Sequence, residues 1–285
     1  MSSSPGSPGS PGPFLLCARQ ELLLAVRSRW TQIFAAVFAV LALAVASSGY
    51  VLSGGHGVQD FARTAASLVE LVLLLVPLTA LLIGVLSLAP ERGAAELLFS
   101  QPVSRRAILF GKVMGLFGAL ASAQAVGFGA AGLVIFSRAG GSGLGSFALL
   151  ALGSFVLTAV FLVLAALVSA GTVGRRTRAL AIALVVWFGA VVLFDVAALG
   201  VASLLPSGPA SRVLIVSVLV NPADAVRTGA LLGIEGSGAF GAASLALLRF
   251  THGPAGAGIL LTASLLVWLV VPALLAARRL DRADL

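Results

Sequence analysis

Six long apolar stretches divide the chain, and shorter polar segments separate them. The stretches cover about residues 31–52, 65–89, 112–137, 145–173, 179–205 and 256–277. A helix needs roughly 20 apolar residues to cross a hydrocarbon core about 30 Å thick, and each stretch is long enough. The pattern therefore predicts an all-α integral membrane protein with six transmembrane helices.

The longest connection, residues 206–255, carries a further apolar piece of about ten residues, which is too short to span. We expect an interfacial or re-entrant segment there, followed by a turn at Asn221-Pro222 that starts a short helix. The alternative interpretation makes residues 213–234 a seventh span. It would place the C-terminal arginines on the opposite side from the other arginine clusters.

Composition supports a single membrane domain over residues 14–285. Hydrophobic residues make up 59% of the 285 positions and charged residues only 10%, against about 25% charged in a soluble domain. The net charge of +8 would suggest nucleic acid in a soluble protein, but here it orients the spans, and no nucleic-acid partner is expected. Of the 18 basic residues, 13 fall on one side of a six-span topology and 5 on the other, which places both termini in the cytoplasm.

The segment before the first span has two parts. Residues 1–13 form a Ser-Pro-Gly repeat and should be disordered. Residues 14–29 mix leucines with charges, which predicts an interfacial helix on the cytoplasmic leaflet, with Trp30 as an aromatic anchor. A signal peptide cleaved after Ala46 is an alternative that the continued apolar run and the later spans disfavour.

The polar segment between the second and third spans, residues 90–112, is amphipathic and carries six charged residues. Pro102 forbids one continuous helix through it, and Ser104 is a plausible N-cap of the second piece. A bent helical segment on the cytoplasmic side indicates a docking surface for an aqueous partner. The expected contact residues are Glu91, Arg92, Glu96, Arg105 and Arg106.

The sequence indicates no chemical active site and no metal site. It lacks the P-loop, G-x-S-x-G and H-E-x-x-H patterns, and its lone Cys17 rules out an intrachain disulfide. The histidines, His56 and His252, lie in predicted loops and are expected to be solvated. We therefore expect a protein that is not an enzyme and binds no cofactor itself.

Three polar side chains interrupt the apolar runs, at a cost of roughly 2.5–3.5 kcal/mol for a carboxylate at mid-membrane. They are Glu70, Gln124 and Asp195. Asp195 either forms structural hydrogen bonds or lines a conduit. Glycines are dense in the third span, which indicates close helix packing, or alternatively a subunit interface or a moving seam.

Residues 91–112, from Glu91-Arg92-Gly93 through Gln101-Pro102-Val103-Ser104-Arg105-Arg106 to Gly111-Lys112, resemble the conserved cytoplasmic segment of ABC-2-type transporter permeases. Ala94 replaces the usual Thr. Three further stretches are similar to the permease subgroup of the nitrous-oxide-reductase maturation transporter, the NosY type. They are Ala18-Arg19-Gln20-Glu21-Leu22 with Arg27-Ser28-Arg29-Trp30, Trp187-Phe188 with Phe194-Asp195, and Leu219 to Arg227.

The resemblance implies a homodimer in the bacterial inner membrane, bound to two copies of a cytoplasmic ABC ATPase that holds ATP and Mg. Residues 90–112 and the N-terminal helix would couple that ATPase to the spans. A periplasmic β-helical protein would sit on the outer face, where Asn221, Pro222, Asp224 and Arg227 form a candidate element. The system would mature the copper–sulfur centre of nitrous-oxide reductase, with membrane lipid as its surroundings. The alternatives are an ABC-2 exporter of lipid, drug or other hydrophobic cargo, and a membrane anchor of an ATPase-driven assembly such as gliding motility.

Overall fold

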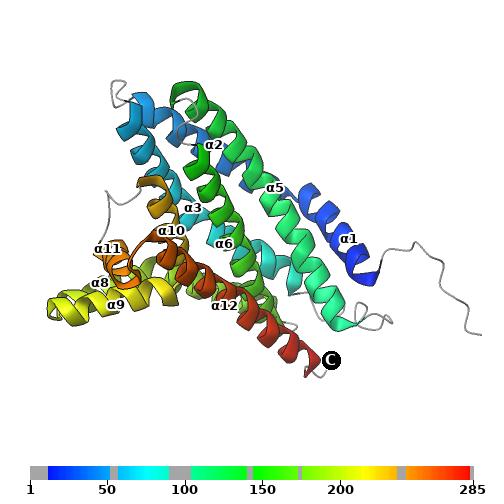
Figure 1. Ribbon diagram of the computed structural model, residues 1–285. Helices are drawn as coiled ribbons and strands as arrows, with labels where there is room; N and C mark the ends of the chain where they lie inside the picture. Colours follow the sequence, from blue (N-terminus) through cyan, green and yellow to red (C-terminus); the bar gives the residue numbers. More distant parts are fainter. Residues whose placement is uncertain are drawn as a thin grey trace, which may run out of the picture.

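The computed structural model describes residues 12–51, 57–89, 104–139, 144–172, 175–235 and 242–282, and every regular element in these ranges is a helix (Figure 1). Most of the helices are long and apolar. In chain order they are α1 (Pro13–Arg27), α2 (Arg29–Val51), α3 (Gly57–Leu88), α5 (Arg105–Ala139), α6 (Leu144–Ala170), α7 (Arg176–Phe188), the π-helix η2 (Gly189–Leu193), α8 (Phe194–Ser203), α9 (Ser207–Val220), α10 (Pro222–Glu235), α11 (Ala242–Thr251) and α12 (Pro254–Asp281).

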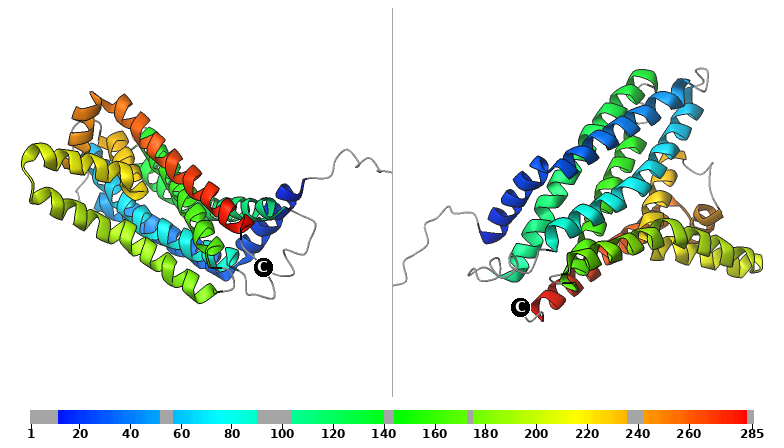
Figure 2. Two further views of the ribbon diagram at one scale, coloured as in Figure 1. Left: turned by 90° about the horizontal axis from the view of Figure 1, so that it is seen from below. Right: turned by 180° about the vertical axis from the view of Figure 1, so that it is seen from behind.

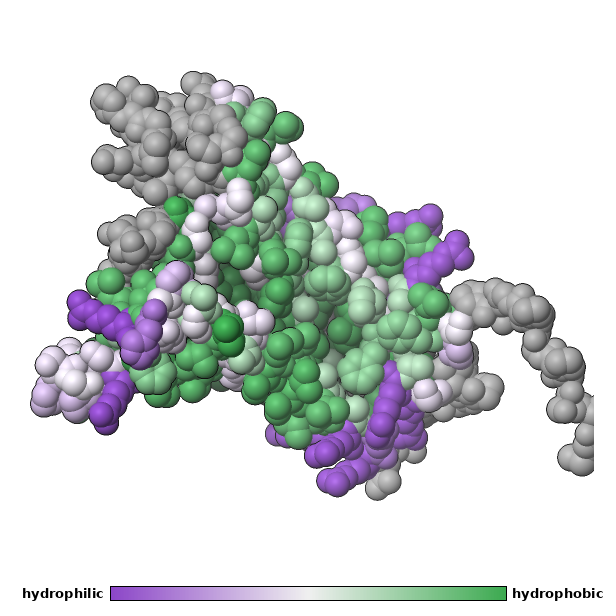
Figure 3. Space-filling view, viewed as in Figure 1, coloured by the Kyte–Doolittle hydropathy of each residue, from purple (hydrophilic) through white to green (hydrophobic). Residues whose placement is uncertain are grey.

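Six helical stretches of the described residues are long and apolar enough to cross a membrane, which confirms the predicted six-span architecture. They are Arg29–Ser48, Thr64–Leu88, Arg105–Ser137, Leu144–Ala170, Arg176–Ser203 and Pro254–Asp281. In Figure 3 a broad apolar surface covers the middle of the molecule, and hydrophilic residues gather near the helix ends, as at the C-terminal end of α12. Such a surface fits a hydrocarbon surrounding.

The third span begins earlier than predicted, and this corrects part of the interpretation of residues 90–112. α5 runs without a break from Arg105 to Ala139, so residues 105–112 form its first turns and no separate interfacial helix. The predicted N-cap is confirmed, because the Ala107 N–H donates to Ser104 Oγ at 3.3 Å. Ile108 and Leu109 are buried against protein, which holds these turns in line with the span. Residues 90–103 lie outside the described residues.

The bundle is organised around α6, which packs against α3, α5, α10 and α12. α6 is apolar on all sides, as is typical of a helix that is surrounded by other helices and by lipid. The largest fully buried side chains come from α2, α3, α5, α6 and α11. They are Phe38, Leu68, Leu81, Leu116, Leu120, Leu150, Leu157, Phe161, Leu162 and Leu247.

The glycines of the third span let neighbouring helices approach closely, which confirms their predicted role in packing. A Cβ at Gly115 would lie 2.5 Å from the Ala18 carbonyl oxygen, and one at Gly127 would lie 2.5 Å from the Phe38 ring. α1 and α2 therefore follow one another along α5, as the right panel of Figure 2 shows. The predicted N-terminal helix is present as α1, and one edge of it is packed against α5.

The connection after the fifth span contains the predicted turn. α9 and α10 meet at Asn221 with a bend of 103°, so they count as a seventh span only if the bent pair is taken together. α10 packs on α3, α6 and α12, and Ala223 and Val226 on it are buried. α8 and α9 run side by side as a hairpin that projects from the bundle (Figure 1).

Candidate functional site

Arg227 on α10 is the centre of a polar cluster that joins three helices. Its Nη1 donates a hydrogen bond to Asp195 on α8 and lies 3.5 Å from Asp224 Oδ1. Its Nη2 lies 3.2 Å from Glu70 Oε2 on α3. The structure thus brings together residues that the sequence assigned to two separate groups, the intramembrane carboxylates and the outer-face element.

Asn221 fixes the geometry of this cluster from the bend between α9 and α10. Its Oδ1 accepts the Ala223 N–H at 3.1 Å, which caps α10 in front of Pro222 at the first helical position. Its Nδ2 donates to Asp224 Oδ2 at 3.1 Å and to the Ala190 carbonyl at 2.7 Å. One side chain therefore ties the start of α10 to the span that carries Asp195.

The Ala190 carbonyl belongs to η2, a single π-helical turn between α7 and α8. Such turns disturb the regular backbone ladder of an α-helix and are frequent at functional sites. Asp195 follows η2 by two residues and reaches Arg227. The π-helical turn thus lies where the fifth span meets α10.

The cluster has more negative than positive groups, since three carboxylates surround one guanidinium. Asp195 and Arg227 are each about a quarter exposed, while the Asp224 side chain is largely buried. A pocket of about 190 Å³ with mostly apolar walls adjoins all three. Asp195 is held in an ion pair in this conformation. No group of three or more His, Cys, Asp or Glu side chains among the described residues is arranged to hold a metal ion.

Gln124 lies apart from this cluster, in a fully bonded network inside the bundle. Its Nε2 donates to Thr158 Oγ1 at 2.7 Å, and its Oε1 accepts from Ser154 Oγ at 2.5 Å. All three side chains are buried. The network satisfies the amide and links α5 to α6.

At the opposite end of the spans, the predicted contact arginines meet the end of α12. Arg106 Nη2 lies 2.5 Å from Asp281 Oδ2, and Arg105 Nη1 donates to the Leu280 carbonyl at 3.4 Å. The Arg106 side chain is still 61% exposed and remains accessible to a partner. Glu91, Arg92 and Glu96 lie outside the described residues.

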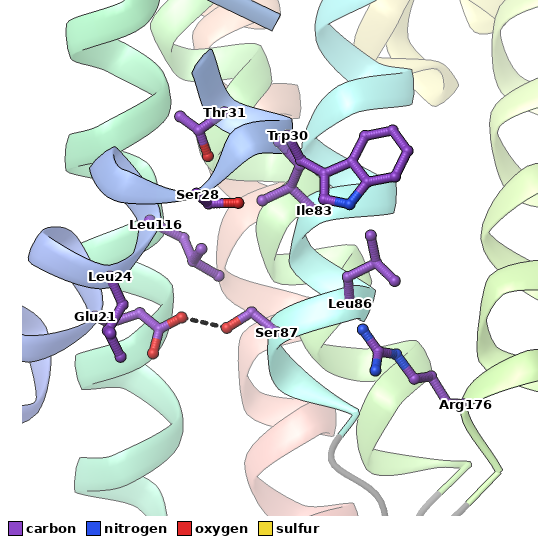
Figure 4. Close-up of a pocket in the computed structure, with 11 residues that line it drawn as sticks. Glu21, Leu24, Ser28, Trp30, Thr31, Ile83, Leu86, Ser87, Leu116 and Arg176 are labelled. Atoms are coloured by element: carbon purple, nitrogen blue, oxygen red, sulfur yellow. Dashed lines mark hydrogen bonds between the residues drawn. The ribbon is translucent and has the colours of Figure 1, made fainter. Parts of the chain in front are cut away.

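A second group at this end was not foreseen from the sequence. Glu21 on α1 is buried, and its Oε1 accepts a hydrogen bond from Ser87 Oγ on α3 (Figure 4). Lys112 Nζ on α5 lies 3.6 Å from Glu21 Oε2 and donates to the Ser87 carbonyl at 3.0 Å. Composition is the sequence feature that could have indicated this contact, because Lys112 is the sole lysine of the chain and Glu21 is the sole acidic residue of α1.

The chain is similar to known transporter permeases over most of its length. A family model described as ABC-2 family transporter protein matches residues 15–285. A protein of Stutzerimonas stutzeri named probable ABC transporter permease protein NosY is 37% identical over 235 residues, which cover 80% of this chain and 85% of the relative. A protein of the same name from Pseudomonas aeruginosa strain PAO1 is 34% identical over 235 residues with the same coverage.

Proposed function

The chain belongs to the ABC-2 family of transporter proteins as a multi-pass permease subunit, and we propose that its transporter serves maturation of the copper–sulfur centre of nitrous-oxide reductase. One observation carries the proposal. Two permeases named NosY share 37% and 34% identity with this chain over four fifths of its length. The Asn221-to-Arg227 element and Asp195, which carry part of the resemblance to the NosY-type subgroup, form one bonded cluster.

A partner ATPase drives an ABC permease, and the sequence of this chain has no P-loop to bind ATP itself. We propose that ATP and Mg are bound by two copies of a cytoplasmic ATPase on a homodimer of this permease. Arg105 and Arg106, together with Glu91, Arg92 and Glu96, form the proposed contact. Support comes from the exposed position of Arg106 at the start of α5, a helix that reaches across the bundle.

Two sets of contacts connect the start of α5 to other helices of the bundle. The Arg106–Asp281 pair connects α5 to α12, and the Lys112–Glu21–Ser87 group connects it to α1 and α3. A partner that binds one packing of these helices better than another shifts the population toward it. In the proposed complex these contacts couple the partner ATPase to the spans, and the ATPase, not this chain, binds the nucleotide.

On the other side, we propose that Asn221, Pro222, Asp224 and Arg227 position a surface for a periplasmic β-helical partner. The bonds from Arg227 to Asp195 and Glu70 support this role, because they hold α10 against two spans. Asp195→Asn tests whether the carboxylate also serves transport. Lost transport with retained assembly would favour a conduit role, and unchanged transport would exclude it.

The proposed location is the bacterial inner membrane with both termini in the cytoplasm. Reporter fusions at Gly141 and at the C-terminus are expected to give opposite locations. Agreement between the two fusions would contradict this orientation.

The deciding experiment is deletion of the gene in its own host, followed by spectroscopy of the copper–sulfur centre in purified nitrous-oxide reductase. We expect the centre to be missing and to return when the gene is restored. A normal centre in the deletion strain would exclude the maturation role and leave an exporter of hydrophobic cargo or an assembly anchor. Proteins that co-purify with the tagged permease identify the ATPase and any outer partner.

A further inference from the structure

Two adjoining pockets form one groove between α2, α3 and α7, at the end of the spans that carries Arg29, Leu88 and Arg176. One pocket, of about 410 Å³, is almost wholly apolar. The other, of about 240 Å³, holds polar side chains. Trp30, Ile83 and Leu86 line both, so the groove is continuous, with an apolar part and a polar part.

The floor of the groove is one face of α3. Its lining residues recur every three or four positions from Leu75 to Ser87, which is the spacing of one helix face. At about 1.5 Å per residue this face is roughly 18 Å long. One leaflet of a bilayer has a hydrocarbon depth of roughly 15 Å. The floor of the groove is therefore long enough to hold an acyl chain.

The polar part contains a buried hydroxyl without a partner. Thr31 is 4% exposed, and its Oγ1 forms no hydrogen bond in the structure. The reason is local, because Ser28 interrupts the helix with a ψ of 132°, so no regular helical turn precedes Thr31. A threonine inside a helix usually bonds a carbonyl three or four residues back. An unpaired buried hydroxyl is costly, and it lines the groove.

Basic residues gather at the polar part of the groove. Arg176 lines it, and Figure 4 shows Arg176 and Trp30 on either side of Leu86 at the mouth. Glu21, the acidic residue of the lining, is already engaged by Ser87 and Lys112. Exposed arginines at the starts of α2 and α7 add to the positive charge. They are Arg29 and Arg175.

We propose that this groove binds an anionic phospholipid from the adjoining leaflet. One acyl chain lies along α3, the Arg176 guanidinium pairs with the headgroup phosphate, and the Thr31 hydroxyl donates to a lipid oxygen. Trp30, which is 65% exposed, sits at the level of the headgroup, where tryptophan is enriched. The inference rests on the chain being a membrane protein and does not depend on the proposed role in nitrous-oxide reductase maturation.

The test uses the full chain purified in mild detergent and titrated with phosphatidylglycerol or phosphatidylcholine, with bound lipid counted by native mass spectrometry. The wild type is expected to prefer phosphatidylglycerol by about tenfold. Both lipids carry the phosphate, but the choline ammonium of phosphatidylcholine is repelled by the arginines of the polar part, whereas phosphatidylglycerol has no such cation. Arg176→Gln should remove the preference. Arg178→Gln, a matched change on the same helix outside the groove, should keep it.

Two further variants separate the parts of the groove. Val37→Trp fills the apolar part and should weaken binding of both lipids, whereas Val40→Trp on the exposed side of α2 should not. Thr31→Val should weaken phosphatidylglycerol binding by roughly threefold. Without added lipid it should leave the melting temperature unchanged or higher, because it removes an unpaired hydroxyl. A structural hydroxyl would instead give a lower melting temperature.

Three results would overturn the proposal. Equal lipid binding by Arg176→Gln and Arg178→Gln would remove the headgroup site. Displacement of phosphatidylglycerol by millimolar inorganic phosphate would indicate an ion site without a lipid. A change of oligomeric state in Val37→Trp, with unchanged lipid binding, would assign the groove to contact between two copies of the chain. Circular dichroism and gel filtration show which variants are folded. If Arg176→Gln does not fold, the loss of phosphatidylglycerol binding in Thr31→Val tests the headgroup site instead.

Discussion

Removal of the Lys112 charge should destabilise the protein, although Lys112 itself is partly exposed, because the buried Glu21 carboxylate loses its cationic partner. The Lys112 side chain is 23% exposed and that of Glu21 only 9%, with 3.6 Å between Nζ and Oε2. At an effective dielectric constant of 20 the attraction over this distance is about 4–5 kcal/mol before desolvation is subtracted. Lys112→Met would leave a buried carboxylate with only the Ser87 hydroxyl as a partner.

Breaking a buried pair from one side costs about 3–5 kcal/mol. Because Lys112 is partly exposed, we expect a loss at or just below the lower end of this range, about 2–3 kcal/mol of unfolding free energy. Glu21→Gln should cost less, about 1 kcal/mol, since the remaining ammonium can reach solvent and the Ser87 carbonyl. The double variant should lose less unfolding free energy than the sum of the two single losses, because the two residues interact.

The measurement is helix content followed during denaturation in mixed micelles, for the wild type, both single variants and the double variant. Arg106→Met is the matched control, because its pair with Asp281 is exposed and contributes little to stability. Equal losses in Lys112→Met and Arg106→Met would refute the argument. Strict additivity in the double variant would also refute it.

Three other perturbations have defined outcomes. Gly115→Leu should separate α1 from α5 and cost about 1–3 kcal/mol or more in the same denaturation assay, because the Cβ would lie 2.5 Å from backbone, whereas Gly129→Leu has open space and should be tolerated. Arg227→Gln should leave three carboxylates facing one another, so limited proteolysis should cut near α10 faster at pH 8 and less so at pH 5, where protonation relieves the repulsion. Arg106→Glu should abolish co-purification of the ATPase, whereas Asp281→Asn, which breaks only the exposed pair, should not.

Each of these has a contradicting result. Equal stability of the two leucine variants would show that the glycines do not set the α1–α5 distance. Proteolysis of Arg227→Gln that does not depend on pH would exclude carboxylate repulsion as the cause. Loss of the ATPase in both Arg106→Glu and Asp281→Asn would assign the effect to the contact between α5 and α12.

The sequence by itself determined the spans, because hydropathy is a local property. A run of about 20 apolar residues is stable across a membrane whichever helices lie beside it. It also determined the Asn221-Pro222 turn and the Ser104 cap, which depend on residues adjacent in the chain. The separate helix expected over residues 104–112 was wrong. The pattern of charges there did not reveal that Ile108 and Leu109 would be buried against other helices.

Only the tertiary structure decided which polar residues meet. Arg227 bonds Glu70 and Asp195 from positions 157 and 32 residues away, and Lys112 meets Glu21 from 91 residues away. Such contacts depend on how the helices are rotated and how far each is shifted along its neighbour. Small residues such as Gly115 fix both by letting two backbones touch. The cost of an unpaired charge inside the bundle favours a partner for Glu21, Glu70 and Asp195, but the packing of the helices decided which partner each one has.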